Sequence, residues 1–205
     1  MKIDIRADIK AATKSLNRIE RKQIPFATML ALNDVAFGAR KELQKQAKKK
    51  FDRPTPFTIS GFQVVKAKKR ELTSVVYIDD KRYEYLKFQI DGGVRLPKKR
   101  ALVIPTTNLR VNKYGNMPRR KVDTLLNRKD TFSGTPRGGG NNANATPGVW
   151  QRKNKNKKLK KLVSYEDYAK YTPRFNFQKI VKGYVKNTFQ RHMEKRLTQA
   201  LAPGR

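Results

Sequence analysis

Apolar residues recur every three or four positions at both ends of the chain, as they do along one face of an α-helix. The sequence predicts a first helix after Asp8, which is a favourable N-cap, and a second helix from Pro25 to about Lys50, because proline suits the first turn of a helix. A proline-rich stretch, residues 52–56, ends the second helix. One face of that helix is marked by Phe26, Leu30, Asn33, Phe37, Arg40, Leu43 and Ala47.

The C-terminal segment carries the clearest helical pattern in the chain. Pro203 and Gly204 follow its last apolar position and mark the end of the predicted helix. The single histidine, His192, lies on the apolar side of this helix, so we predict a packed structural histidine rather than a catalytic base or a metal ligand. The apolar stripe consists of Phe177, Ile180, Val181, Tyr184, Val185, Phe189, Met193, Leu197 and Leu201.

Between the helical segments the apolar period changes, and β-branched and aromatic residues become frequent. Residues 2–5 fit either a short strand or an arm, and residues 83–90 fit either a short helix or an irregular edge. A further helix is predicted to start at Pro118. The predicted strands span residues 62–67, 72–78, 102–104, 148–152 and 159–165.

These elements predict an α+β fold, with two N-terminal helices and a long C-terminal helix packed on a small, mostly antiparallel sheet with long loops. A chain of 205 residues suits one domain, 1–205. Its expected parts are an N-terminal helical part (1–57), a part with sheet and loops (58–174) and the C-terminal helix (175–205). Within the middle part, residues 133–147 are rich in Gly and Asn, and we expect them to be flexible.

The charge of the chain indicates which class of partner such a domain binds. The chain has 49 Lys and Arg against 16 Asp and Glu, a net charge of +33, and this density of like charge favours an anionic partner. Nucleic acid is the first candidate, an acidic protein surface the second and anionic lipid a distant third. No apolar run approaches the roughly 20 residues that cross a bilayer, so we expect no membrane partner. The absence of Cys excludes disulfides and thiolate zinc sites, and we expect assembly in a cytoplasm.

The densest positive charge lies in residues 146–165, TPGVWQRKNKNKKLKKLVSY. A disordered arm would continue into polar sequence, whereas strand-forming residues return at once after the charges, so we predict a hairpin with a basic tip. A charged edge that blocks aggregation is the simpler explanation of the tip, but the net charge greatly exceeds what solubility requires. The predicted partner-facing or DNA-facing residues are Arg152, Lys153, Lys155, Lys157, Lys158, Lys160 and Lys161.

Whether this hairpin meets DNA phosphates or an acidic neighbouring protein stays open at this point. Trp150, the only tryptophan, precedes the charges, and we expect it to be an anchor in the core or in a subunit interface rather than a platform for a base.

The sequence shows no convincing catalytic, cofactor or metal site. The neighbouring carboxylates Asp79 and Asp80, and likewise Glu166 and Asp167, border strand ends and would point to opposite faces. The glycines 138–140 lack the lysine that follows them in a phosphate-binding loop. We therefore expect no enzyme activity and no cofactor.

Several short motifs follow one another in an order that resembles a known family. They are FDRPTPF (51–57), DGGVR (91–95), GNMPR (115–119), PGVWQR (147–152) and YTPRFNF (171–177) before the final helix. With these motifs, the chain resembles phage and prophage minor tail proteins of the lambdoid protein Z type, which are tail-completion proteins. It departs from them in the Gly/Asn-rich residues 138–144 and in the extra lysines of 153–161.

The resemblance implies a structural role in the virion, with assembly in the host cytoplasm. Such proteins join the tail to the head-neck complex, as a homohexameric ring around the DNA path. The implied partners are the tail-tube or tail-terminator protein, the neck or head-completion protein and genomic DNA in the lumen, bound without sequence preference. The alternative is a non-enzymatic, sequence-independent nucleic-acid-binding protein that acts outside a virion.

Overall fold

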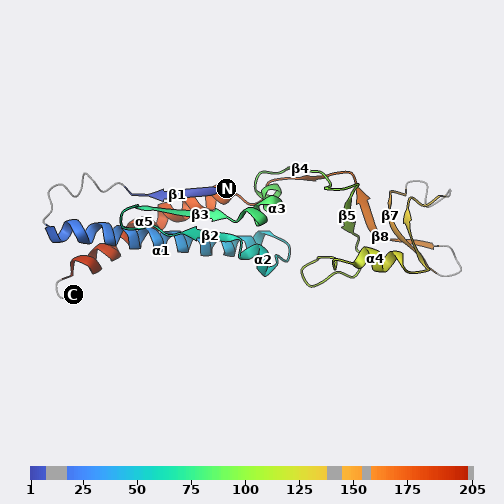
Figure 1. Cartoon of the computed structure of the whole chain (residues 1–205), viewed down its shortest axis with the longest axis horizontal. Helices are drawn as coiled ribbons and strands as arrows, with labels where there is room; N and C mark the ends of the chain where they lie inside the picture. The colour runs from blue at the N-terminus through green and yellow to red at the C-terminus, as the bar shows by residue number, and fades with distance from the viewer. Residues whose placement is uncertain (8–17, 138–144, 154–157, 203–205) are drawn as a thin grey trace. The chain divides into compact units, whose positions relative to one another are not determined.

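The computed structural model describes residues 1–7, 18–137, 145–153 and 158–202 (Figure 1). The chain divides into two compact units, where one domain was expected. Unit 1 comprises Met1–Ile90 and Pro173–Arg205, and unit 2 comprises Asp91–Thr172. Each unit has its own cluster of buried apolar residues. The two ends of the chain therefore form one unit, and the long middle segment forms the other.

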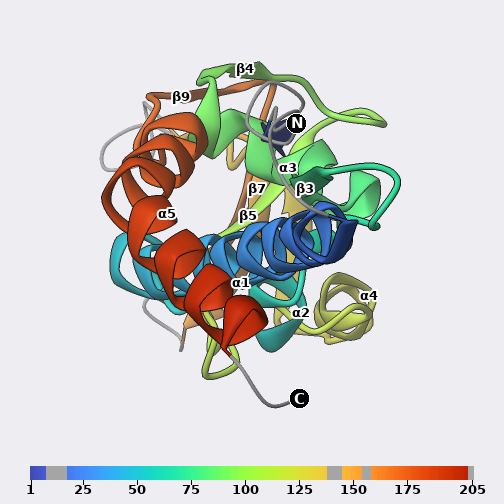
Figure 2. The same cartoon turned by 90° about the vertical axis from the view of Figure 1, so that its left-hand side faces the viewer.

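Unit 1 combines two long helices with a three-stranded antiparallel sheet in the order β1-β3-β2. Helix α1 packs against α5 and also against β2 and β3 (Figure 2). Phe175 is buried in the core, and its ring centroid lies 5.0 Å from that of the partly buried Phe51 and 5.8 Å from that of the buried Phe62. The elements of unit 1 are β1 (Lys2–Arg6), α1 (Arg18–Lys50), α2 (Pro56–Ile59), β2 (Phe62–Val65), β3 (Thr73–Ile78), α3 (Asp80–Ile90) and α5 (Phe177–Leu201).

The helix boundary predicted at Pro25 is not found, because Pro25 lies inside the continuous helix α1. Proline inside a helix costs about 3 kcal/mol. The following turns bury a complete apolar face, which offsets this cost, and the Thr28 hydroxyl donates a hydrogen bond to the Ile24 carbonyl at 2.8 Å. Most of the first predicted helix, after Asp8, lies outside the described residues.

The buried face of α1 combines several alanines with Leu32, Val35 and Leu43 and leaves out its phenylalanines. Of the face predicted from the sequence, Leu43 and Ala47 are buried, but Phe26 is 43% exposed. Small side chains let neighbouring elements approach a helix closely, and α1 packs against α5, β2 and β3. The residues at every fourth position of this face are Ala27, Ala31, Val35, Ala39, Leu43 and Ala47.

Unit 2 contains a four-stranded antiparallel sheet in the order β5-β8-β7-β6 and a separate two-stranded ribbon, β4-β9. Its core is small and consists of Leu109, Leu125, Val149, Leu162 and Val163. The elements are β4 (Gly93–Arg95), β5 (Leu102–Pro105), α4 (Lys121–Leu126), β6 (Thr131–Gly134), β7 (Gly148–Lys153), β8 (Lys158–Glu166) and β9 (Ala169–Tyr171).

The mixed α+β class is confirmed, but in the described residues the single small sheet is replaced by three sheets. Residues 2–5 belong to a strand, and residues 83–90 are helical. The helix predicted at Pro118 begins at Lys121. The strands β4, β6 and β9 were not predicted, and β6 includes the first two residues of the segment expected to be flexible.

Candidate nucleic-acid interface

The predicted basic hairpin is present as β7 and β8, which pair antiparallel from Gly148 opposite Ser164 to Lys153 opposite Lys158. Of the seven candidate basic residues, the structure describes Arg152, Lys153, Lys158, Lys160 and Lys161, whereas Lys155 and Lys157 lie outside the described residues. Trp150 lies in β7, directly opposite Lys161.

A register shift in the hairpin decides which side chains share a face. Val149 pairs with Val163, but the next residue, Trp150, pairs with Lys161, so Leu162 is an extra residue in β8. Such a bulge allows two consecutive residues to point to one side, and Leu162 and Val163 are both buried. Beyond the bulge, the shift places Lys161 beside Trp150.

The two faces of the sheet therefore differ in chemistry. Val149 and Val163 lie on the side that packs on the small core. Since side chains alternate along a strand and paired residues share a face, the opposite side carries a row of directly paired residues. Phe132 pairs with Trp150, and Trp150 pairs with Lys161. We call this side, with Phe132, Trp150, Arg152 and Lys161, the basic-aromatic face.

On the basic-aromatic face a cationic side chain lies over each of the two aromatic rings. The Arg152 guanidinium carbon lies 4.4 Å from the centroid of the Phe132 ring, and Lys161 Nζ lies 5.6 Å from that of the Trp150 ring. Lys161 Nζ also donates hydrogen bonds to Ser164 Oγ, at 2.7 Å, and to Thr146 Oγ1. A guanidinium held over a ring keeps its N–H edge available for a phosphate or a carboxylate.

These contacts favour phosphate binding over base stacking. An aromatic platform for bases needs open ring faces, whereas the rings of Phe132 and Trp150 hold Arg152 and Lys161. Trp150 is half-buried on the side away from the core, and its indole Nε1 is buried with no hydrogen-bond partner in the described part of the chain. Trp150 is not among the buried residues of the unit 2 core, and its role as a core or interface anchor stays a prediction.

Like charges are placed opposite each other at the end of the hairpin. Lys153 and Lys158 are directly paired and both exposed, an arrangement that is unfavourable without a nearby anion. Lys160 pairs with Gln151 and is half-buried, so it belongs to the other side of the sheet. The hairpin therefore exposes Arg152, Lys153 and Lys158 to solvent. Lys161 is half-buried and already donates hydrogen bonds to Thr146 and Ser164.

The hairpin is attached to the preceding turn through Asp130. Its carboxylate accepts hydrogen bonds from Arg128, at 2.7 and 2.9 Å, and from the Gln151 side chain at 2.7 Å, while its backbone carbonyl accepts the Arg152 N–H at 2.8 Å. The hydrogen bonds from Arg128, and next from Gln151, lower the pKa of Asp130 to about 2. Asp130 thereby fixes the strand position that carries Arg152. The sequence does not point to this residue, because no local motif marks a carboxylate that reaches the next strand.

Of the residues considered for catalysis, Asp79 and His192 belong to unit 1, whereas Glu166 ends β8 and accepts a hydrogen bond from Ser164 Oγ at 2.5 Å. Asp79 accepts hydrogen bonds at the start of α3 and forms an ion pair with Arg82 at 3.0 Å. The hydrogen bond from the Arg82 side chain is the largest cause of the lowered pKa of Asp79. His192 is a half-buried residue of α5 whose Nδ1 lies 3.9 Å from Asp34 Oδ2. Across the described ranges there is no group of three or more His, Cys, Asp or Glu side chains that could hold a metal ion.

Comparisons with family models, with curated proteins and with solved structures give no match for this chain. Among the helices in the described residues, none combines the length and the apolar character needed to cross a bilayer.

Proposed function

We propose that the protein is a structural component of a phage virion that completes the tail and joins it to the head-neck complex. The order of short motifs from 51–57 to 171–177 supports this role. The observation that carries the DNA-facing part of the proposal is the basic-aromatic face, where Arg152 and Lys161 are held over aromatic rings in a chain of net charge +33.

In the proposed assembly, six copies form a ring between the tail-tube or tail-terminator protein and the neck or head-completion protein. The hairpins of six copies face the DNA path and pool their positive potential there. Contacts from Lys and Arg to phosphates carry no sequence information, so any genomic sequence can pass or rest in the ring. The opposed pair Lys153 and Lys158 gains most from an anion, because a phosphate between the two would relieve their repulsion.

The test is a phage in which Lys153, Lys155, Lys157, Lys158, Lys160 and Lys161 are all changed to Gln. We expect tails to be completed less efficiently or packaged DNA to be lost, measured as phage yield and as DNA retained per particle. The matched control changes six exposed lysines of unit 1, Lys48, Lys49, Lys50, Lys69, Lys182 and Lys186, to Gln and thus removes the same charge. Unchanged yield and DNA retention in the hairpin variant would contradict the proposal.

A second candidate function rests on the same face: a sequence-independent nucleic-acid-binding protein that acts outside a virion. Size measurement by light scattering and a salt-dependent DNA titration separate the two. A monomer that binds DNA tightly, with affinity falling steeply as salt rises, and that is absent from purified particles would favour this alternative. Presence at the head-proximal end of purified tails in electron micrographs would favour the tail-completion role.

A further inference from the structure

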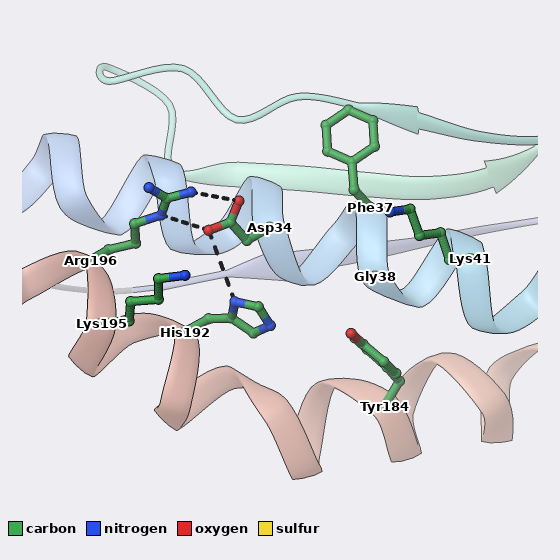
Figure 3. Close-up of a pocket in the computed structure, with 8 residues that line it drawn as sticks. All are labelled: Asp34, Phe37, Gly38, Lys41, Tyr184, His192, Lys195 and Arg196. Carbon is green, nitrogen blue, oxygen red and sulfur yellow. Dashed lines mark hydrogen bonds and ion pairs between the residues drawn. The ribbon is translucent and has the colours of Figure 1, made fainter.

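A cavity of about 350 Å³ lies between α1 and α5, within unit 1 (Figure 3). The proposed function makes no use of it. Helix α1 contributes Asp34 and Lys41 to its wall, and α5 contributes Tyr184, His192 and Lys195. Gly38 is also part of the wall, and the end of the Tyr184 ring occupies the space that a side chain at Gly38 would need.

The carboxylate of Asp34 in this wall is already neutralised. Arg196 Nε lies 2.6 Å from Asp34 Oδ2, and Arg196 Nη2 lies 3.0 Å from Asp34 Oδ1. This pairing raises the pKa of Arg196. Lys41 and Lys195 line the same cavity, are exposed, and form no ion pair with any described residue. The cavity therefore has an excess of positive charge.

Two polar groups in the cavity wall also have unused hydrogen-bonding capacity. His192 Nδ1 faces Asp34, while His192 Nε2 is buried and has no partner among the described residues. Figure 3 shows this second nitrogen on the side of the ring toward Tyr184, whose hydroxyl points into the same space. A buried nitrogen without a partner is costly, and a bound oxygen atom would remove that cost.

We propose that this cavity binds a phosphate-type oxyanion, either a free phosphate ion or a phosphate group of a nucleic acid. Lys41 and Lys195 supply the opposite charge, and the Tyr184 hydroxyl donates a hydrogen bond to an anion oxygen. When the His192 ring carries both protons, Nδ1–H faces Asp34 and Nε2–H donates to the anion as well. Because Arg196 is engaged with Asp34 through Nε and Nη2 and with Gln199 through Nη1, it neutralises the carboxylate rather than binding the anion itself.

The experiment uses the fact that the chain has one histidine, so its ring signals in an NMR spectrum need no assignment. The full chain is titrated with inorganic phosphate at fixed pH and at an ionic strength held constant with chloride. We expect a saturable shift of the His192 ring signals. Tyr184→Phe and Lys41→Gln should each raise the Kd for phosphate by about threefold to tenfold. Lys186→Gln, an exposed lysine of α5 outside this cavity, is the charge-matched control and should leave the Kd within about twofold.

A His192 signal that moves linearly without saturation would overturn the proposal, and so would equal weakening by Lys186→Gln and Lys41→Gln. A second arm replaces phosphate with a short DNA duplex. A matching shift assigns the site to nucleic-acid phosphate, and a response to phosphate alone assigns it to the free ion. The hairpin variant with six Lys→Gln changes should keep the phosphate response of His192, so failure of this site and failure of the proposed function are distinguishable.

Discussion

Gly38 and Gly183 both lie inside the long helices of unit 1, but a methyl group added at each would meet different surroundings. At Gly38 it would lie 2.6 Å from Cζ of Tyr184, whereas at Gly183 no atom lies within 4 Å. We expect Gly38→Ala to lower the free energy of unfolding by about 1 to 3 kcal/mol through overpacking. Gly183→Ala should raise it by up to about 1 kcal/mol, because alanine favours the helix. Urea unfolding followed by circular dichroism measures both.

The same pair of glycines provides its own control, since the chemical change is identical. Combining Gly38→Ala with Tyr184→Ser should recover part of the lost stability, because the shorter side chain leaves room for the methyl group. If Gly38→Ala proved as stable as Gly183→Ala, the close contact between Gly38 and Tyr184 would not exist in solution.

Asp130 gives a prediction about acid stability. Its pKa of about 2 in the folded chain is below the ordinary value of 3.8. The carboxylate therefore stabilises the folded state fully above pH 4 or so, and this contribution is lost as the pH falls from about 4 to about 2. We expect Asp130→Asn to be less stable than the unmodified protein near neutral pH and equally stable near pH 2. Urea unfolding followed by Trp150 fluorescence measures the difference at each pH.

The matched control for this prediction is Asp123→Asn, which removes an exposed carboxylate from α4. The comparison separates the effect of the Asp130 contacts from that of removing one negative charge. A stability difference for Asp130→Asn that stays constant down to pH 2 would contradict a stabilising carboxylate at this position.

Contacts between individual side chains were the feature of the structure that the sequence could least predict. Placing His192 on the apolar side of a helix followed from periodicity alone, and the structure puts it among residues of the α1–α5 contact. Its neighbours Asp34 and Arg196 are 162 positions apart, and no local pattern links them. Contacts of this kind depend on how the two helices cross, which the spacing of apolar residues does not fix.

At the scale of elements, the basic-aromatic face predicts that an uncharged residue contributes to DNA binding. Phe132 holds Arg152 over its ring, so Phe132→Leu should let the guanidinium move and should weaken binding of a short duplex by about twofold to fivefold. In a background of Arg152→Gln, the same change should have almost no further effect. Fluorescence anisotropy of a labelled duplex at constant salt gives the four dissociation constants. Additive effects of the two changes would mean that Phe132 acts independently of Arg152.

The elements themselves were predictable where alternation was strong and unpredictable where it was weak. The hairpin of β7 and β8 follows from apolar residues on both sides of the charges. The strands β4 and β6 contain glycine or small polar residues over three or four positions, too few to show a period. The face of α1 was misassigned because alanine fills much of its buried side, while a hydrophobic pattern gives most weight to phenylalanine.

At the scale of the whole molecule, the two units bury separate cores. The core of unit 1 joins residues from both ends of the chain, and a sequence pattern has no means of showing that residues 1–90 and 173–205 fold together. The core of unit 2 is formed by a few residues between Leu109 and Val163. A smaller core stabilises a unit less, and the positive charge on the hairpin opposes folding further.

We therefore expect unit 2 to unfold at lower urea concentration than unit 1. Trp150, the single tryptophan, reports on unit 2, whereas circular dichroism of helices reports mainly on α1 and α5 of unit 1. The fluorescence midpoint should fall below the circular-dichroism midpoint, since two-state behaviour fails when units unfold separately. Adding a DNA duplex should raise the fluorescence midpoint more than the circular-dichroism midpoint, because a ligand stabilises the unit that binds it. Coincident midpoints, with and without DNA, would mean that the chain unfolds as one cooperative unit.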